Sequence, residues 1–309
     1  MKRNKITVIG AGNVGATCAF ICAVKELGDI VLLDIDPDMP KGKALDMFQC
    51  AQILNFDVNI TGTNDYKDIA HSDVVIITAG LARKPGMSRE ELLEKNANII
   101  AHAASEIKKF APNAIIINVT NPVDILTYHL LKKSGFAKNK VMGQAGVLDS
   151  ARYAAFISME LGVSAKDIRP LVLGGHGDTM VPAPEFTTVN GLPVSGFIKP
   201  ERLNEINDRT AKGGGEIVVL LKSGSAYYAP AAATAVMAEA ILKDQKRLIP
   251  VSCYLDGEYG HKELCIGVPA VLGKNGIEKI VEVKLTGETK TLFDKSAETY
   301  KQGIQELPQ

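Results

Sequence analysis

The fold is decided by Lys5-Ile6-Thr7-Val8-Ile9-Gly10-Ala11-Gly12-Asn13-Val14-Gly15. In this stretch an apolar strand runs into a G-x-G-x-x-G motif, and a helical pattern follows. Gly10 permits a tight turn, Gly12 leaves the backbone open to a pyrophosphate, and Gly15 lets the helix pack close to the strand. Free N–H groups at the start of the helix would face the phosphates. The pattern predicts a dinucleotide site made by Gly10, Ala11, Gly12, Asn13, Val14 and Gly15.

An acidic residue at the end of the next apolar run indicates which dinucleotide is bound. Asp34 follows residues 30–33 and lies nineteen positions beyond Gly15. A carboxylate there accepts hydrogen bonds from the ribose hydroxyls and repels a 2′-phosphate. Asp36, rather than a basic residue, comes next. These residues predict NAD as the cofactor.

Strands and helices alternate through the first half of the chain. The helical segments carry apolar residues at three- and four-residue spacing, and one begins with the capping box formed by Ser88 and Glu91. Repeated alternation of this kind predicts an α/β fold, with a doubly wound parallel-sheet Rossmann domain over residues 1–145. The near-continuous apolar runs typical of strands buried on both faces are 6–9, 30–33, 58–60, 74–78 and 115–119.

The pattern changes after about residue 145. Glycine and proline punctuate short β-branched runs, which is typical of antiparallel hairpins, and long helical patterns follow. This half is predicted to be an α+β substrate domain over residues 146–309. Its expected hairpins are at 171–173 and 181–189, with another formed by 247–254 and 264–271. Its expected helices are at 201–221, 227–242 and near 292–305.

Composition excludes several classes of partner. Thirty-five Lys and Arg balance 35 Asp and Glu over 309 residues, so a general nucleic-acid binder is not expected. The longest apolar tract, 226–242, is interrupted by Pro230 and Glu239, which favours a core helix over a membrane span. The five cysteines form no C-x-x-C pair, and no secretory signal is seen at the amino terminus. A cytoplasmic protein is expected.

Two segments carry candidate catalytic side chains. His176 lies among glycines, and imidazole is suited to proton exchange near neutral pH; a loop histidine that only bonds a turn is the alternative. Asp149 and Arg152 are three residues apart and share a helix face. Asp149 could fix the tautomer of a histidine, and Arg152 could grip a carboxylate. An ordinary intrahelical ion pair explains their spacing at least as well.

Two further segments follow predicted strands at the edge where α/β sheets bind ligands. Residues 80–89 contain three cations, including Arg83 and Arg89, and could form a lid over an anion or a basic surface loop. Asn121 could donate to a substrate oxygen, or it could simply cap the helix that begins near Pro122. The backbone at Val119 would then pass the nicotinamide ribose.

Taken together and in this order, these segments resemble the lactate/malate dehydrogenase family over essentially the whole chain. Residues 82–89, 212–216 and 225–228 look like the bacterial group of that family that acts on malate, and lactate-specific members typically have Gln where Arg83 stands. The resemblance implies reversible oxidation of (S)-malate to oxaloacetate by hydride transfer to NAD⁺. Lactate or another 2-hydroxyacid is the alternative substrate. An NAD-binding glycosidase is a remote alternative, because its metal-binding Cys and His positions have no counterpart here.

The resemblance also implies a role for each candidate residue. His176 would be the general base, Asp149 would hold it, and Arg89 would polarise the carbonyl. Arg152 and Arg83 would bind the two carboxylates of the substrate. A small dicarboxylate substrate, no metal, no membrane and a homodimer or homotetramer are expected. The cofactor contacts that the resemblance adds are Asn96, Val119, Thr120 and Asn121, the last of which would touch substrate as well.

Overall fold

The computed structural model describes residues 3–81 and 88–308, so Arg83 lies outside the described residues. In the first half the elements are β1 (Lys5–Ile9), α1 (Asn13–Val24), β2 (Asp29–Leu33), α2 (Met39–Gln49), α3 (Ala51–Leu54), β3 (Ile60–Thr63), β4 (Val74–Ile77), α4 (Arg89–Phe110), β5 (Ile115–Asn118), α5 (Val123–Ser134) and β6 (Val141–Gly143). In the second half they are α6 (Gly146–Leu161), β7 (Ile168–Arg169), β8 (Val172–Leu173), β9 (Val181–Pro182), β10 (Thr188–Val189), β11 (Leu192–Pro193), α7 (Pro200–Leu221), α8 (Tyr228–Leu242), β12 (Arg247–Asp256), β13 (Lys262–Gly273), β14 (Gly276–Ile280) and α9 (Gly287–Gln305).

A parallel sheet forms the centre of the first half. Its strands lie in the order β3-β2-β1-β4-β5-β6, and every neighbouring pair is parallel. All four residues of β4 are buried, as expected of a strand covered on both faces. The order reverses between β1 and β4, which opens a crevice outside the carboxyl ends of these strands. The predicted doubly wound α/β fold is confirmed.

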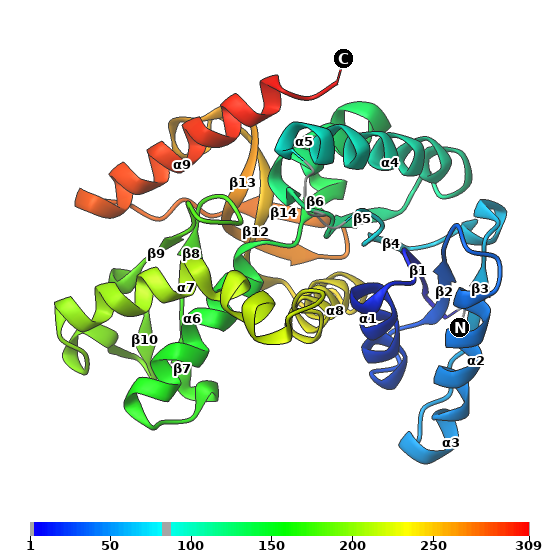
Figure 1. Cartoon of the computed structure of the whole chain (residues 1–309), viewed down its shortest axis with the longest axis horizontal. Helices are drawn as coiled ribbons and strands as arrows, with labels where there is room; N and C mark the ends of the chain where they lie inside the picture. The colour runs from blue at the N-terminus through cyan, green and yellow to red at the C-terminus, as the bar shows by residue number, and fades with distance from the viewer. Residues whose placement is uncertain (1–2, 82–87, 309) are drawn as a thin grey trace.

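Helices cover both faces of this sheet (Figure 1). α4 and α5 lie on one face, while α1 and α8 lie on the other. Two separate apolar clusters result, one containing Ile6 and Val8 and the other containing Ile9 and Ile77. α4 begins as predicted, because the Oγ of Ser88 accepts a hydrogen bond from the Glu91 N–H at 3.0 Å. The helices thereby fix the strand ends that carry the candidate site.

The strand predicted at residues 58–60 is wrong. Val58 is buried in a connecting segment, and the strand is β3, whose Ile60 pairs with Ile30 of β2. β3 is the outermost strand, and its residues after Ile60 are Thr61, Gly62 and Thr63, so its sequence is not a continuous apolar run. Val58 lies in the core and Ile60 packs against it, but only Ile60 belongs to the hydrogen-bonded strand.

The second half extends the same sheet. β12, β13 and β14 pair antiparallel, and β12 joins the edge of the parallel region where Ser252 pairs with Gly143 of β6. The predicted α+β character is confirmed, but its long hairpin belongs to the central sheet rather than to a separate one. β8 and β9 form a short antiparallel hairpin, and the loop between them carries His176.

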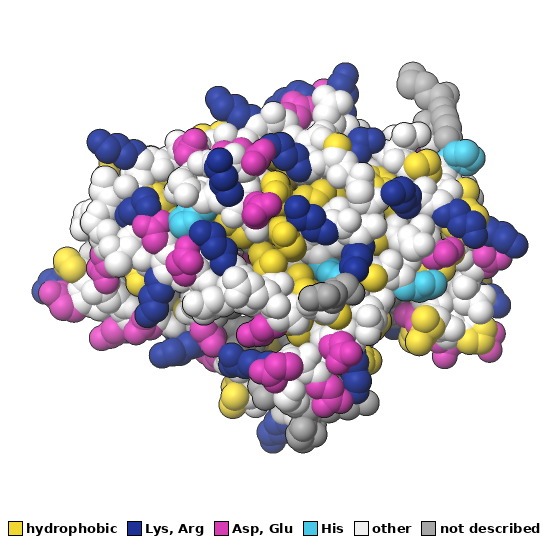
Figure 2. All heavy atoms as spheres, turned by 90° about the horizontal axis from the view of Figure 1, so that it is seen from above, with side chains coloured by type: hydrophobic (Ala, Val, Ile, Leu, Met, Phe, Trp, Pro, Cys, Tyr) yellow, Lys and Arg dark blue, Asp and Glu magenta, His cyan; other side chains and the backbone are white. Residues whose placement is uncertain are grey.

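Charges are mixed over the face of the molecule that Figure 2 shows. Cationic and anionic side chains are interspersed there, with no broad area of one sign. This arrangement agrees with the equal numbers of cations and anions in the sequence. That face offers no extended cationic surface of the kind that binds nucleic acid.

Candidate active site

The three glycines of the loop after β1 meet different surroundings. Gly10 has φ +103°, and a Cβ there would lie 2.6 Å from the Ala79 nitrogen. A Cβ on Gly15 would lie 1.8 Å from the Gly10 carbonyl oxygen. A Cβ on Gly12 would meet nothing within 4 Å. Gly10 and Gly15 are therefore needed by the fold, whereas Gly12 borders an open space at the start of α1.

This contrast makes a direct test of the loop. We expect Gly12→Ala to leave the free energy of unfolding close to wild type, but to weaken NADH binding by about tenfold or more because the methyl group occupies the open space. We expect Gly15→Ala, the matched control, to lose about 1–3 kcal/mol of stability through overpacking. Fluorescence titration with NADH and chemical denaturation measure the two effects. Wild-type NADH affinity in Gly12→Ala would contradict a cofactor role for the loop.

Asp34 lies beside the glycine loop, as predicted. It follows β2, and its Oδ2 accepts a hydrogen bond from the Ala11 N–H at 2.6 Å. Lys43 of α2 donates from Nζ to the Ala11 carbonyl oxygen, also at 2.6 Å. The loop is thus held between a carboxylate and an ammonium group, and Asp34 stands where a ribose could reach it. The sequence had not indicated Lys43.

The structure brings His176, Asp149 and Arg152 together from distant parts of the chain. The Nδ1 of His176 lies 2.9 Å from Oδ2 of Asp149, and Arg152 donates from Nη1 to Oδ1 of the same carboxylate at 3.2 Å. Asp149 is 2% exposed, so little solvent competes with either contact. Asp149 and Arg152 do form the intrahelical pair considered above, and the pair also engages the histidine. Nε2 is left as the nitrogen that can exchange a proton with a ligand.

Opposing effects set the basicity of His176. Burial lowers the pKa of the imidazole, the charge and hydrogen bond of Asp149 raise it, and the nearby Arg152 lowers it. The net result is a pKa above the ordinary histidine value. An imidazole of this kind both takes a proton from a hydroxyl group and holds it as imidazolium.

Residues that the sequence analysis missed hold the main chain of His176. Its N–H donates to Oδ2 of Asp124 at 2.7 Å, and the Tyr300 hydroxyl donates to its carbonyl oxygen at 3.0 Å. The Oγ of Ser296 accepts from the Gly175 N–H at 3.0 Å. These residues lie on α5 and α9, far from the histidine in sequence. No short motif links them, so only the tertiary structure identifies them.

A cavity of about 360 Å³ joins the cofactor loop to the histidine. Val14 of the glycine motif borders it, as do Arg152 and His176. The amide Nε2 of Gln144 is buried without a hydrogen-bond partner at this cavity. A carbonyl oxygen of a bound molecule would satisfy that donor. The remaining lining residues include Val119, Asn121, Leu148, Gly177, Asp178, Met180, Gly214, Gly215 and Ser225.

The glycines at 213–215 bring α7 close to this cavity. They lie inside the continuous helix, so they form no phosphate loop. A Cβ on Gly214 would lie 3.5 Å from Nη2 of Arg152, and one on Gly213 would lie 3.4 Å from its Cδ. The absence of side chains at these positions therefore lets α7 approach Arg152 closely and leaves room for its guanidinium group beside the cavity.

The other predicted residues differ in how closely they approach the cavity. Asn121 and Val119 line it, and Thr120 is buried beneath it, donating to the Ala79 carbonyl oxygen at 2.8 Å. Asn96 is buried, and its amide bonds the backbone of Leu81 and Asn121. Asn96 thus ties the start of the 80–89 segment to the Asn121 turn, so its predicted contact with NAD remains a prediction.

The two lid arginines are not both placed by the structure. Arg89 is exposed at the first position of α4 and does not border the cavity in the described part of the chain. Arg83 lies in the segment 82–87, outside the described residues. Their predicted contacts with substrate remain predictions.

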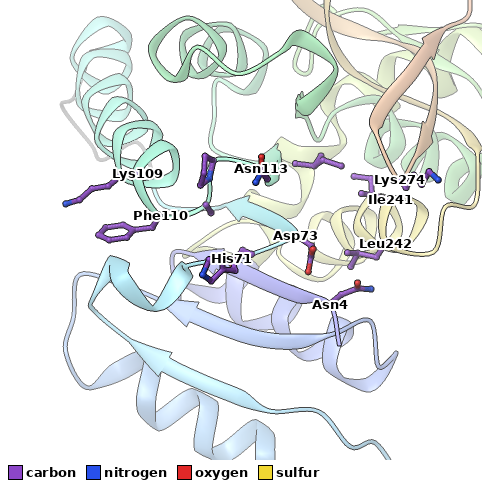
Figure 3. Close-up of a pocket in the computed structure, with 13 residues that line it drawn as sticks. Asn4, His71, Asp73, Lys109, Phe110, Asn113, Ile241, Leu242 and Lys274 are labelled. Carbon is purple, nitrogen blue, oxygen red and sulfur yellow. The ribbon is translucent and has the colours of Figure 1, made fainter. Parts of the chain in front are cut away.

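A second, larger cavity of about 630 Å³ lies at the opposite end of the sheet (Figure 3). Asn4 and Asp73, which border it, directly precede β1 and β4, and Asn113 lies two residues before β5. The side chain of Lys109 extends away from the cavity. This is the amino end of the parallel strands. Ligands of doubly wound sheets bind at the carboxyl end, which favours the smaller cavity as the active site.

Comparisons with known proteins agree with this geometry. Residues 4–143 match a family model described as lactate/malate dehydrogenase, NAD binding domain, and residues 146–308 match its alpha/beta C-terminal domain. The chain belongs to the lactate/malate dehydrogenase family. It is an NAD-dependent oxidoreductase whose first half is the family's NAD-binding domain.

Relatives in the family are similar over their whole length. A malate dehydrogenase from Rhodopirellula baltica is 59% identical, covering 97% of this chain and 96% of that protein. The crystal structure of Cryptosporidium parvum malate dehydrogenase is 47% identical, with a TM-score of 0.96 over 99% of both chains. A lactate dehydrogenase from the same organism, complexed with lactic acid and NAD, is 44% identical, with a TM-score of 0.95 over all of both chains. The family fold therefore accommodates either substrate.

The described residues fit NAD. Gly12 leaves the backbone open to a pyrophosphate, and the Asp34 carboxylate could accept a hydrogen bond from a ribose hydroxyl. The unpartnered side-chain amide of Gln144 could donate a hydrogen bond to the cofactor. In residues 3–81 and 88–308, no three or more His, Cys, Asp or Glu side chains are grouped to hold a metal ion. None of the helices in those ranges has the length and apolarity needed to cross a bilayer.

Proposed function

We propose that this chain is an NAD-dependent malate dehydrogenase that interconverts (S)-malate and oxaloacetate. The observation that carries the proposal is the His176–Asp149–Arg152 arrangement at a cavity that continues to the NAD loop. Proton exchange, carboxylate binding and hydride acceptance are the elements that oxidation of a 2-hydroxy acid requires. The high identity to malate dehydrogenases over nearly the full chain supports malate as the substrate.

In this proposal each side chain has one task. NAD⁺, when bound, supplies the carbon that accepts hydride from C2 of malate. Neutral His176 takes the hydroxyl proton at Nε2, and Asp149 stabilises the imidazolium that forms. Arg152 binds the carboxylate next to the reacting carbon as a bidentate donor. Arg89 stabilises negative charge on the carbonyl oxygen in the reverse direction.

Side-by-side assays test the substrate. We expect NADH oxidation to be much faster with oxaloacetate than with pyruvate, and slow when NADPH replaces NADH because Asp34 faces the ribose. A spectrophotometric assay at 340 nm, the absorbance wavelength of the reduced nicotinamide ring, measures all three rates. Faster turnover of pyruvate would assign the chain to lactate, the second candidate, whose fold the Cryptosporidium parvum lactate dehydrogenase shares.

The proposed partner of the second carboxylate gives a sharper prediction. Arg83→Gln should reduce kcat/KM for oxaloacetate by an amount equivalent to roughly 2–5 kcal/mol, the usual range for losing one member of a desolvated charge pair. The rate with pyruvate should rise relative to that with oxaloacetate, because no unpaired guanidinium then faces a methyl group. Kinetics with both substrates measure the ratio. An unaffected oxaloacetate rate would remove Arg83 from the specificity mechanism.

We propose that the chain forms a homodimer or homotetramer in the cytoplasm. Large apolar side chains are exposed on two of the helices: Phe48 on α2 is 51% exposed, and Tyr228 on α8 is 69% exposed. A shallow cavity bordered by α1, α2 and Tyr228 lies on the same side. A second copy of the chain would cover such a surface.

The state of the cysteines supports the proposed cytoplasmic location. All five cysteines are free, which suits a reducing compartment.

A further inference from the structure

The most unusual buried charge outside the proposed reaction is Asp124. It lies in the first turn of α5, and its side chain is completely buried. Oδ2 accepts the hydrogen bond from the His176 N–H at 2.7 Å, and Oδ1 accepts one from the Ser252 hydroxyl at 2.6 Å. Burying a carboxylate is costly even when it is hydrogen-bonded. A neutral acceptor would satisfy the same N–H, so the charge calls for an explanation.

We infer that Asp124, in its ionised form, is a positioning residue for His176 that also supplies a second negative charge behind the imidazole. The inference rests on the proposed function, in which His176 transfers the proton. Asp149 holds the ring at Nδ1, and Asp124 holds the same residue at its main-chain nitrogen. The position of Nε2 at the cavity is then determined from two directions.

Asp124 holds His176 from the first turn of α5, close to the segment that lines the cavity. Asn121, which lines the cavity, lies three residues before it, and α5 begins between them. One short segment therefore places a polar side chain at the ligand and a carboxylate under the histidine loop. Tyr300 of α9 completes the anchorage by donating to the His176 carbonyl oxygen at 3.0 Å. Because both main-chain polar groups of His176 are bonded, the backbone from which the ring extends is held in place, and Asp149 orients the ring itself.

The electrostatic consequence follows from the surroundings of Asp124. Burial raises the pKa of Asp124 to about 6, against the opposing hydrogen bonds from Ser252 and His176. Its negative charge in turn adds to the effect of Asp149 in raising the pKa of His176. Protonation of Asp124 below about pH 6 would therefore have two effects. It would weaken the hydrogen bond from the His176 N–H, and it would remove the negative charge that helps to raise the pKa of His176. The titratable or charged groups that face Asp124 or its two partners are His176, Asp149, Arg152, Tyr300, Cys253 and Cys265.

Asp124→Asn tests the charge while retaining the shape. The amide oxygen can accept from the His176 N–H, and the amide nitrogen can face the Ser252 hydroxyl. We expect the pKa of His176 to fall by about half a unit to one unit, the scale of one partly screened charge at this range. NMR titration of ¹³C-labelled histidine in the ligand-free protein measures that pKa, with His176→Asn assigning the signal. The acid limb of kcat/KM for malate should move to lower pH by a similar amount.

Two further variants keep the test decisive. Asp124→Ala, which has no acceptor, should lower kcat/KM by about 10²-fold through misplacement of the imidazole, with NADH binding retained. Ser252→Ala keeps the carboxylate but removes a hydrogen bond that favours its ionisation, so Asp124 should stay protonated to higher pH. The acid limb of kcat/KM for malate should then move to lower pH, in the same direction as in Asp124→Asn but by a smaller amount. Asp294→Asn, which neutralises the carboxylate beside His261 outside the cavity, is the control and should leave the pKa of His176 unchanged.

The outcomes separate this inference from the proposed function. An unshifted His176 pKa in Asp124→Asn, or a Ser252→Ala acid limb that coincides with that of wild type, would overturn the electrostatic role of Asp124. Full activity of folded Asp124→Ala would overturn its positioning role. If the histidine titration shifts as expected but the wild-type protein turns over no malate, the proposed function fails and the contact between Asp124 and His176 stands.

Discussion

His176→Asn should slow turnover by orders of magnitude while leaving the cofactor bound. We expect kcat for oxaloacetate reduction and for malate oxidation to fall by about 10²- to 10⁴-fold, the range for losing a positioned general acid or base. NADH affinity should stay close to wild type, because the loop after β1 is built from other residues. Stopped-flow measurement of NADH oxidation and fluorescence titration with NADH report the two quantities separately.

His261 provides a matched control for this experiment. Its Nε2 lies 2.9 Å from Oδ1 of Asp294, so it too is a mostly buried histidine paired with a carboxylate. It is not among the residues that border the active-site cavity. His261→Asn should therefore keep wild-type kcat, even if the unfolding temperature falls. Turnover by His176→Asn at the rate of this control would remove His176 from the mechanism.

Asp149→Asn should produce the second large effect, together with a change in pH dependence. Without the carboxylate, the tautomer of His176 is no longer fixed, and kcat should fall on the order of 10³–10⁴-fold, as in other histidine–aspartate pairs. Asp149 raises the pKa of His176, so its loss lowers that pKa. Malate oxidation requires neutral imidazole and is lost as the pH falls through the pKa. The acid limb of the residual oxidation should therefore move to lower pH.

Reduction of oxaloacetate should respond in the opposite way. It requires the imidazolium form and is lost as the pH rises through the same pKa, so in Asp149→Asn the reverse reaction should fail at lower pH than in wild type. Complete pH profiles in both directions, with Asp294→Asn alongside, measure these shifts. A residual profile that coincides with the wild-type profile would show that the charge of Asp149 does not set the basicity of His176.

The sequence predicted the parallel sheet because its central strands are apolar on both faces. Residues 74–78 form a near-continuous apolar run that ends in Thr78, and the structure buries all of β4. β3 was misplaced because it lies at the edge of the sheet, where Thr61 and Thr63 alternate with less polar positions. The attachment of β12 to β6 could not be predicted, since antiparallel pairing between strands far apart in sequence leaves no local pattern. Only the pairing of Ser252 with Gly143 reveals it.

Some residues of the candidate site could likewise be predicted from the sequence, and others could not. The placement of Gly10, Gly12 and Asp34 near one another could be predicted, because their spacing follows the pattern of a dinucleotide-binding strand–helix–strand unit. Their contacts with NAD remain predictions. The joining of His176 to Asp149 was implied only by resemblance, and the structure shows it at 2.9 Å. Asp124 and Tyr300 were missed because they act on the backbone of another residue. Such contacts depend on which helices pack together, and no residue type is characteristic of them.

The continuity of the central sheet bears on how the chain can be divided. β6 lies between β5 and β12, so it is an interior strand although it stands at the predicted boundary near residue 145. A fragment ending there would turn β6 into a free edge, whose unpaired N–H and C=O groups invite association with other chains. In such a fragment the Asp124 carboxylate would also lose its two hydrogen-bond donors, the Ser252 hydroxyl and the His176 N–H. We therefore expect residues 1–145 expressed alone to associate or to be less stable than the whole chain, because the sheet and the Asp124 contacts both continue into the second half.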